Sequence, residues 1–294
     1  MTGIEWTGVT WNPTTGCDRI SPGCDHCYAL TMAKRLKGMG QAKYQRDGDP
    51  KTSGPGFGLT VHPDALSLPL RWRKPRKVFV NSMSDLFHAD VPAEFIARVF
   101  AVMAACPQHT FQVLTKRHAR MKSLLNDDGF LGAIGRYWMY DDSVPDEATW
   151  PGWPLPNVWL GVSVEDQKWF DIRWAALAET PATVRFISAE PLLGWIDMAF
   201  DHECGDPPHW TCPPVPDWVI IGGESGPGAR PMKLTWAREI VKQCGWSGIT
   251  PFVKQLGAVL GREFDAGPHG ADWDHWPEDL RVREFPLAAE QVTA

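Results

Sequence analysis

The sequence predicts an α/β fold, a full or partial β/α (TIM-like) barrel of parallel strands. Short β-branched runs alternate with helix-like segments, polar clusters follow the runs, and 294 residues suit one barrel. An open, doubly wound sheet is the alternative. Six or seven alternating units favour the full or partial barrel over the open sheet.

Seven segments are predicted to be strands, because each is short, apolar and rich in β-branched residues. In parallel β/α folds the carboxyl ends of the strands face the ligand, so the polar residues that follow them are expected to form one site. The predicted strands are 9–12, 77–81, 110–114, 158–162, 184–188, 218–221 and 251–254.

Three segments between these strands have the apolar spacing of amphipathic helices, namely 92–106, 166–178 and 235–244. Pro92 lies near the start of the first helix, and Gly245 is expected to end the last one. We predict a single barrel over 1–258 with inserted loops near 41–72, 126–156 and 201–216. An acidic extension, 259–294, is expected to pack on it.

The chain has no apolar run near the roughly 20 residues that span a bilayer. Its first residues lack the basic and apolar regions of a signal peptide, so we expect a cytoplasmic protein with reduced thiols. Residues 1–126 hold 17 Lys and Arg against 9 Asp and Glu, although the whole chain has a net charge of −6. A phosphate-bearing partner or an ordinary solvated surface would explain this basic half.

Three cysteines, Cys17, Cys24 and Cys27, are clustered after the first predicted strand. Three thiolates on one loop suit a [4Fe–4S] cluster and leave one iron open to chelate S-adenosylmethionine. Zinc is the rival, with His26 or a distant residue as its fourth ligand. A loop without any metal is the third alternative.

The stretch from Trp6 to Ala29, which contains these cysteines, resembles a phage- and bacterium-borne three-cysteine-motif family of unknown activity that is similar to radical SAM enzymes. The resemblance implies a radical-SAM-like β/α barrel with a cluster at the three cysteines, and it supplies no substrate. It covers most of the chain, with further matching stretches at 82–88, 114–117, 188–192, 222–226, 254–255 and 276–283.

Two features depart from the general radical SAM pattern. Six residues separate Cys17 from Cys24, whereas that pattern has three. Its Gly-Gly-Glu motif, which follows the second strand and contacts the methionine amino group, has its counterpart here only near the sixth strand. By position, Ser82, Ser84 and Asp85 would take this cofactor-binding role, and a turn with a helix cap is the alternative.

Other strand ends supply further candidates. The predicted catalytic residues are Glu190, Glu224 and Lys116. The two glutamates are chosen because a carboxylate at a barrel mouth is either functional or hydrogen-bonded. A structural ion pair between a glutamate and Lys116, Arg117 or Lys254 is the alternative. The predicted cofactor-binding residues on these strands are Ser163, Gly222 and Gly223, the glycines allowing close approach of adenosine or phosphate.

A second metal site is considered at His202, Cys204, His209 and Cys212, with a proline-braced loop and free thiols as the alternative. Basic runs at 34–46 and 71–77 could grip a nucleic-acid backbone, or form a solvated helix face and a strand lead-in.

Together these patterns predict a radical-SAM-type enzyme that modifies or repairs a nucleic acid or nucleobase, with DNA, RNA or a nucleotide as its partner. One alternative is a zinc-stabilised nucleic-acid-binding protein without catalysis. Another is a radical SAM enzyme that acts on a small metabolite or peptide.

Overall fold

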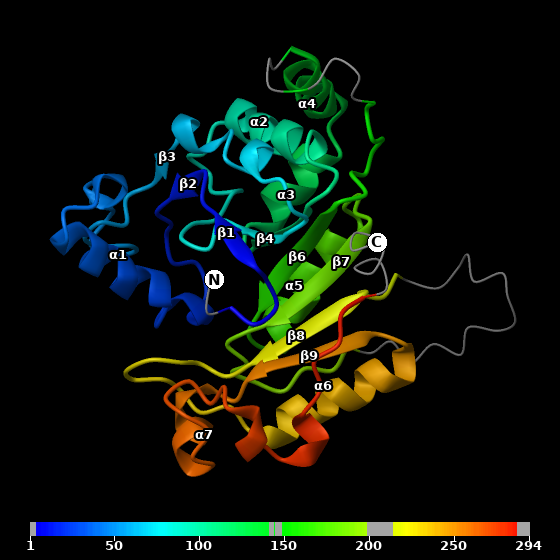
Figure 1. Cartoon of the computed structure of the whole chain (residues 1–294). Coiled ribbons are helices and arrows are strands. Elements are labelled where there is room, and N and C mark those ends of the chain that lie inside the picture. Colours follow the sequence, from blue (N-terminus) through cyan, green and yellow to red (C-terminus); the bar gives the residue numbers. More distant parts are fainter. Residues whose placement is uncertain (1–3, 141–143, 145–148, 199–213, 287–294) are drawn as a thin grey trace, which may run out of the picture. The chain divides into compact units, whose positions relative to one another are not determined.

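Seven parallel strands confirm the predicted α/β fold class in the computed structural model (Figure 1). The model describes residues 4–140, 144, 149–198 and 214–286. The main sheet has the strand order β1-β4-β5-β6-β7-β8-β9, which follows the order of these strands along the chain. Parallel strands in chain order, with helices in the described crossovers between most of them, are the arrangement of a partial β/α barrel.

All seven predicted strands are present, and each end lies within two residues of its prediction. The apolar runs are continuous rather than alternating because most positions in these strands are buried, as is usual in parallel sheets. The strands are β1 (Val9–Trp11), β4 (Lys77–Val80), β5 (Thr110–Thr115), β6 (Val158–Val164), β7 (Val184–Ala189), β8 (Trp218–Gly222) and β9 (Thr250–Gln255). A second, antiparallel sheet pairs β2 (Thr14–Thr15) with β3 (Thr60–Val61).

The described residues contain seven α-helices, and three of them confirm the predicted ones. They are α1 (Tyr28–Gly38), α2 (Ala93–Ala104), α3 (His118–Leu125), α4 (Asp128–Tyr140), α5 (Gln167–Ala178), α6 (Leu234–Ser247) and α7 (Gly257–Glu263). Short 3₁₀ turns are Pro22–Cys24, Ala42–Tyr44, Pro63–Ala65, Pro69–Arg71, Trp273–His275 and Glu278–Leu280. No helix among the described residues is both long and apolar enough to cross a membrane.

Two of the predicted boundaries are corrected. Helix α6 continues through Gly245 and ends before Gly248, whose φ of 67° gives the left-handed cap that terminates a helix. The segment 126–156, predicted as an inserted loop, contains α4, because Phe130 and Ile134 repeat one turn apart and are buried, and the helix packs on α2. The division into a barrel and an acidic extension stays a prediction.

The chain forms two units, Met1–Val162 with Glu179–Thr183 and Ser163–Ala178 with Val184–Leu287. Their positions relative to one another are not determined, so each is described by itself. In the first unit, α2 supplies an almost wholly buried face, and the fully buried Trp11 donates its Nε1–H to the carbonyl of Ala65 at 2.8 Å. In the second, α6 packs on β8 and β9, and the Trp218 ring lies 5.7 Å from those of Phe186 and Phe252.

Acid is expected to destabilise the first unit through His109, which is fully buried before β5 and donates from Nε2 to the carbonyl of Pro69 at 3.2 Å. Burial lowers the pKa of His109, so the unfolded chain binds its proton first and stability falls as the pH drops below about 6.5. A His109→Gln variant should lose less stability than the wild type between pH 7 and pH 5, measured by urea denaturation. Equal losses would contradict this role for His109.

Candidate cysteine site

The three predicted metal ligands, Cys17, Cys24 and Cys27, lie in the segment that connects β2 to α1. Cys17 follows Gly16, Cys24 ends a 3₁₀ turn, and Cys27 caps the amino terminus of α1. Backbone hydrogen bonds from Cys24 to Ser21 at 2.9 Å and from Cys27 to Cys24 at 3.3 Å make two successive turns. All three side chains are half-buried, and those of Cys17 and Cys27 pack against the cluster that contains Ala29 and Met83.

Burial and neighbouring charges both act on the pKa of the first thiol. Burial raises the pKa of Cys17 to about 12, and the Asp85 carboxylate and Cys24 act in the same direction. The charge of the Arg117 guanidinium opposes them. The thiol therefore lies between an acidic and a basic side chain.

Cys27 has a similar environment with a different cation. Burial raises the pKa of this thiol, Cys24 adds to the rise, and the charge of Lys116 opposes it. Cys24 thus interacts with both of the other cysteines, and two consecutive basic residues, Lys116 and Arg117, each act on a different thiol.

Three half-buried thiols on one short loop form a donor set whose chemistry suits an iron–sulfur cluster or a thiolate-bound metal. Within the described residues, no three His, Cys, Asp or Glu side chains are close enough together to hold a metal ion. The residues fit such a group by their chemistry, but their arrangement does not bring three donors together, so the thiols would have to turn toward a common point to bind it.

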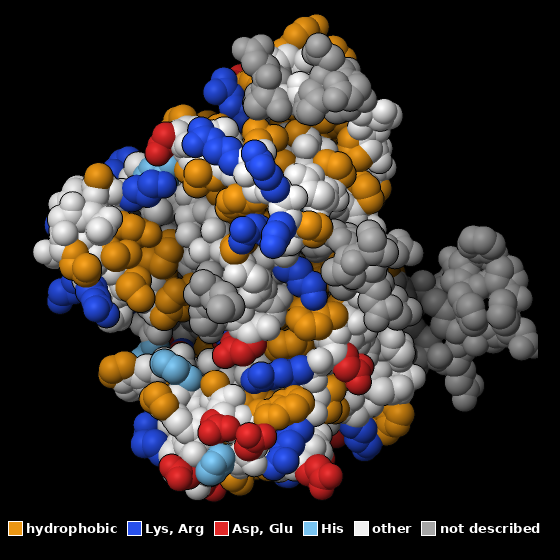
Figure 2. Space-filling model, in the orientation of Figure 1, with side chains coloured by type: hydrophobic (Ala, Val, Ile, Leu, Met, Phe, Trp, Pro, Cys, Tyr) orange, Lys and Arg blue, Asp and Glu red, His pale blue; other side chains and the backbone are white. Residues whose placement is uncertain are grey.

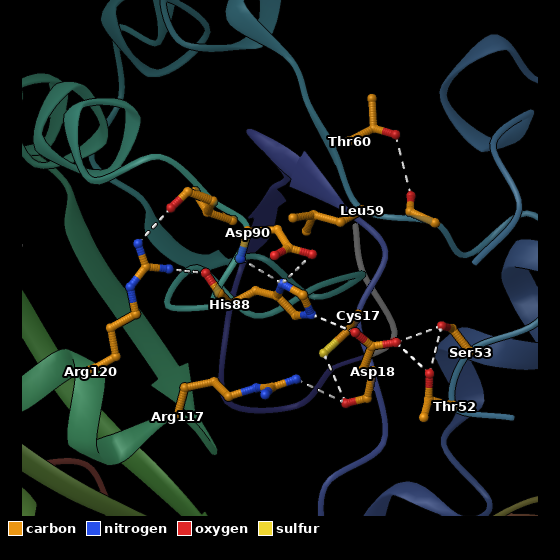
Figure 3. A network of polar contacts seen from close by, with 12 residues as sticks. Cys17, Asp18, Thr52, Ser53, Leu59, Thr60, His88, Asp90, Arg117 and Arg120 are labelled. Carbon is orange, nitrogen blue, oxygen red and sulfur yellow. Dashed lines mark hydrogen bonds and ion pairs between the residues drawn. The ribbon is translucent and has the colours of Figure 1, made fainter. Parts of the chain in front are cut away.

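Asp18, beside Cys17, is the centre of a polar network that sequence analysis missed (Figure 3). Its carboxylate accepts hydrogen bonds from Thr52 Oγ1 at 2.6 Å, Ser53 Oγ at 2.7 Å and His88 Nε2 at 2.9 Å. His88 Nδ1 accepts from the backbone N–H of Asp90 at 3.2 Å, so Nε2 is the nitrogen that carries the proton. The network ties the cysteine loop to two distant segments of the first unit.

The same bonds explain the acidity of Asp18. Burial alone would raise the pKa of this carboxyl, but the hydrogen bonds from Thr52, Ser53 and His88 lower it to about 2. Asp18 is therefore a carboxylate at neutral pH. Three side-chain donors hold this partly exposed carboxylate in place beside Cys17.

Ser82, Ser84 and Asp85, predicted as cofactor ligands, lie beside this loop. Asp85 is buried, and it accepts hydrogen bonds from Thr115 Oγ1 at 2.7 Å, from the Lys116 N–H at 2.9 Å and from the Phe87 N–H at 3.0 Å. Its carboxylate therefore joins the loop after β4 to the end of β5, and the bond from Phe87 forms the kind of turn that the sequence left as an alternative. A cofactor role for it stays a prediction.

Both serine hydroxyls also have partners in the first unit. Ser82 Oγ donates to Asn12 Oδ1 at 3.2 Å, and Ser84 Oγ lies 2.7 Å from Thr14 Oγ1. The backbone of Ser84 forms a bridge to Gly16, directly before Cys17. The structure thus brings the predicted cofactor residues of β4 next to the predicted metal ligands.

In the second unit, Glu190 has the ion pair that the sequence left as an alternative. Lys254 Nζ lies 2.6 Å from Glu190 Oε1, and Gln255 Nε2 donates to the same oxygen at 3.3 Å. The Ser163 hydroxyl donates to the Glu190 carbonyl at 3.1 Å. Glu190, Lys254 and Ser163 therefore meet at the carboxyl ends of their strands.

Glu224 and the glycines of 222–226 have structural uses that the sequence did not reveal. Glu224 is buried, and it accepts from Arg230 Nη2 at 2.6 Å and Nε at 3.0 Å. A Cβ atom on Gly223 would lie 2.3 Å from the carbonyl oxygen of Leu256, so this glycine is required by backbone packing. On Gly222 a Cβ would meet the Glu190 side chain at 3.2 Å.

The predicted ring of strand-end residues falls into two groups, one in each unit. The cysteines, Ser82, Ser84, Asp85 and Lys116 belong to the first unit, and Ser163, Glu190, Gly222, Gly223 and Glu224 belong to the second. A single site made from both stays a prediction. The possible zinc ligands His202, Cys204, His209 and Cys212 lie outside the described residues.

A protein family described as "Protein of unknown function (DUF5131)" matches residues 1–277. The chain belongs to this family. No curated protein matches the chain. The family assignment establishes kinship over most of the sequence, and the description of the family gives no activity.

Three solved structures of spore photoproduct lyase are distantly similar to this DUF5131 protein. A variant with bound AdoMet and dinucleoside spore photoproduct has a TM-score of 0.34 at 14% identity, over 62% of this chain and 45% of that one. The lyase complexed with dinucleoside spore photoproduct has a TM-score of 0.34 at 14% identity, over 60% of this chain and 44% of that one. The DUF5131 chain thus spans less than half of each lyase, and a likeness at this level supports no argument about function.

Proposed function

We propose that this protein is a radical-SAM-type enzyme that binds a [4Fe–4S] cluster at Cys17, Cys24 and Cys27 and modifies or repairs a nucleic acid or nucleobase. The observation that carries the proposal is the set of three half-buried thiols on one short loop, where Cys17 and Cys27 pack against the same buried cluster and Arg117 lies beside Cys17. A reducing compartment such as the cytoplasm would keep these thiols available.

When bound, the cluster supplies the electron that cleaves the sulfonium of S-adenosylmethionine. The residues of the chain hold and shield this chemistry. Asp18, clamped by three side-chain donors, fixes the backbone beside Cys17. Ser82, Ser84 and Asp85 are the proposed contacts to S-adenosylmethionine in this unit, and their side chains would share or exchange their present partners.

In the second unit, Ser163, Gly222 and Gly223 remain proposed cofactor contacts, and Glu190 and Glu224 remain proposed catalytic residues. Glu190 is the more accessible of these two, because its side chain is 19% exposed against 4% for Glu224, and Lys254 Nζ lies 2.6 Å from its Oε1. Glu224 is held by two guanidinium contacts with Arg230, which favours a structural role. Lys116, in the first unit, remains a proposed catalytic residue, and its charge favours the thiolate form of Cys27.

Charge and exposed aromatic surface favour a nucleic acid as the substrate. Figure 2 shows Lys and Arg side chains on the face of the first unit that carries α1 to α3, with few acidic side chains among them. Tyr28, one residue after Cys27, is 53% exposed, and Met32 follows on the same face of α1. A cationic surface with an exposed ring can hold a phosphate backbone and stack a base.

The proposal is tested by anaerobic purification and reconstitution, followed by iron, sulfide and zinc analysis. The protein is then reduced in the presence of S-adenosylmethionine and assayed for 5′-deoxyadenosine. We expect about four irons per chain and 5′-deoxyadenosine in the wild type. A Cys24→Ala variant should lose both, whereas Cys244→Ala, which removes a buried thiol in α6, should retain both.

The enzyme proposal would be refuted by stoichiometric zinc without sulfide and by no cleavage of S-adenosylmethionine. Those results would favour the zinc-stabilised nucleic-acid-binding protein. A cluster with cleavage but no affinity for DNA or RNA at low salt would favour a small metabolite or peptide as the substrate, because nucleic-acid binding strengthens as salt falls.

A further inference from the structure

The carboxyl end of β5 points a guanidinium group at the first cysteine. Arg117 Nη2 donates to the carbonyl oxygen of Asp18 at 3.2 Å, and Cys17 Sγ lies 3.6 Å from the same oxygen. Figure 3 shows the Arg117 side chain reaching toward Asp18 and Cys17 from the side opposite Thr52 and Ser53. The cation and the sulfur atom are therefore neighbours around one acceptor.

The position of Arg117 is fixed by the fold. Its backbone N–H donates to Thr115 Oγ1 at 2.8 Å, and that hydroxyl in turn donates to Asp85. The Arg117 Nε atom is buried and has no hydrogen-bond partner among the described residues. An unsatisfied buried donor is unfavourable, so an acceptor near this guanidinium would be favoured.

A cysteine sulfur that binds metal is a strong candidate for that acceptor. As a thiol, Cys17 directs its own proton to the Asp18 carbonyl, and as a thiolate it has no proton to give and can only accept. Arg117 already counteracts burial and the Asp85 charge at this sulfur. Reduction of a bound cluster adds one negative charge, which a neighbouring cation stabilises.

We propose that Arg117 donates a hydrogen bond to the Cys17 sulfur when that sulfur binds the cluster, and that its charge raises the reduction potential of the cluster. The inference rests on the proposed iron–sulfur function and gives Arg117 a positioning and charge-compensating role in it. The cluster takes up one electron from an external low-potential donor, and Arg117 itself is neither oxidised nor deprotonated.

The test is the midpoint potential of the reconstituted cluster, titrated with dithionite as the electron donor and followed by absorbance and electron paramagnetic resonance. We expect Arg117→Met to have a more negative potential than the wild type at equal iron and sulfide content. Arg117→Lys, which keeps the charge, should lie between them. Lys122→Met removes one positive charge from the surface of α3, where Lys122 pairs with Glu179, and should leave the potential unchanged.

An Arg117→Met cluster with the wild-type potential would overturn the inference, as would a shift of the same size in Lys122→Met. If Arg117→Met does not retain iron, the comparison of Arg117→Lys and Arg117→Gln decides, since only the former keeps the charge and should stay nearer the wild type. Absence of iron and sulfide from the reconstituted wild type would instead refute the proposed function, which keeps the two failures distinct.

Discussion

Replacing Arg173 by methionine is expected to lower the free energy of unfolding by about 3–5 kcal/mol. Arg173 and Glu165 are fully buried, and Arg173 Nη1 donates to Glu165 Oε2 at 2.9 Å and to the Ser163 carbonyl at 2.5 Å. The guanidinium also lies 4.1 Å from the ring centroid of Trp169. Methionine fills much of the space but leaves the Glu165 carboxylate without its counter-charge.

Denaturation by guanidinium chloride, followed by tryptophan fluorescence, measures this loss. A double variant, Arg173→Met with Glu165→Leu, is the matched control, because it removes both charges and keeps an apolar interior. Replacement of a whole buried ion pair is often nearly neutral, so the double variant should recover most of the stability. If it unfolds at the same denaturant concentration as the single variant, the loss comes from packing around Trp169 and not from a stranded charge.

The strands could be predicted from sequence because their signal is local. Trp218 to Ile221 is an unbroken apolar run between Asp217 and two glycines, and its burial in β8 follows from that run alone. Helix α2 is also local, with its apolar residues three or four positions apart. Helix α4 was missed since its buried residues are few and its sequence contains three glycines, at 129, 132 and 135.

The contacts of the candidate site are not local, and this limits what the sequence can predict. Asp18 meets Thr52, Ser53 and His88 across 34, 35 and 70 residues. Its position beside Cys17, and that of His88 at the end of the 82–88 stretch, were the only signals. The Glu190 pair with Lys254 could be considered beforehand, because both follow strands whose carboxyl ends were expected to meet.

The cysteine loop should be sensitive to a single methyl group at Gly16. This residue has a φ of 88°, and a Cβ atom there would lie 2.4 Å from the carbonyl carbon and oxygen of Gly58. Gly16 cannot simply move away, because its N–H donates to the Met83 carbonyl at 3.0 Å and its backbone bridges Ser84. We therefore expect Gly16→Ala to shift the backbone directly before Cys17.

Gly54→Ala is the control that separates the steric clash expected in Gly16→Ala from the strain of a left-handed alanine. Gly54 also has a φ of 88°, but nothing lies within 4 Å of the position that its Cβ would take. Both variants carry the penalty of a left-handed alanine, whereas only Gly16→Ala meets another backbone, so its free energy of unfolding should be lower by a further 1–3 kcal/mol or so. Reconstituted Gly16→Ala should also retain less iron than Gly54→Ala, and equal stability and iron content would show that Gly16 does not set the position of Cys17.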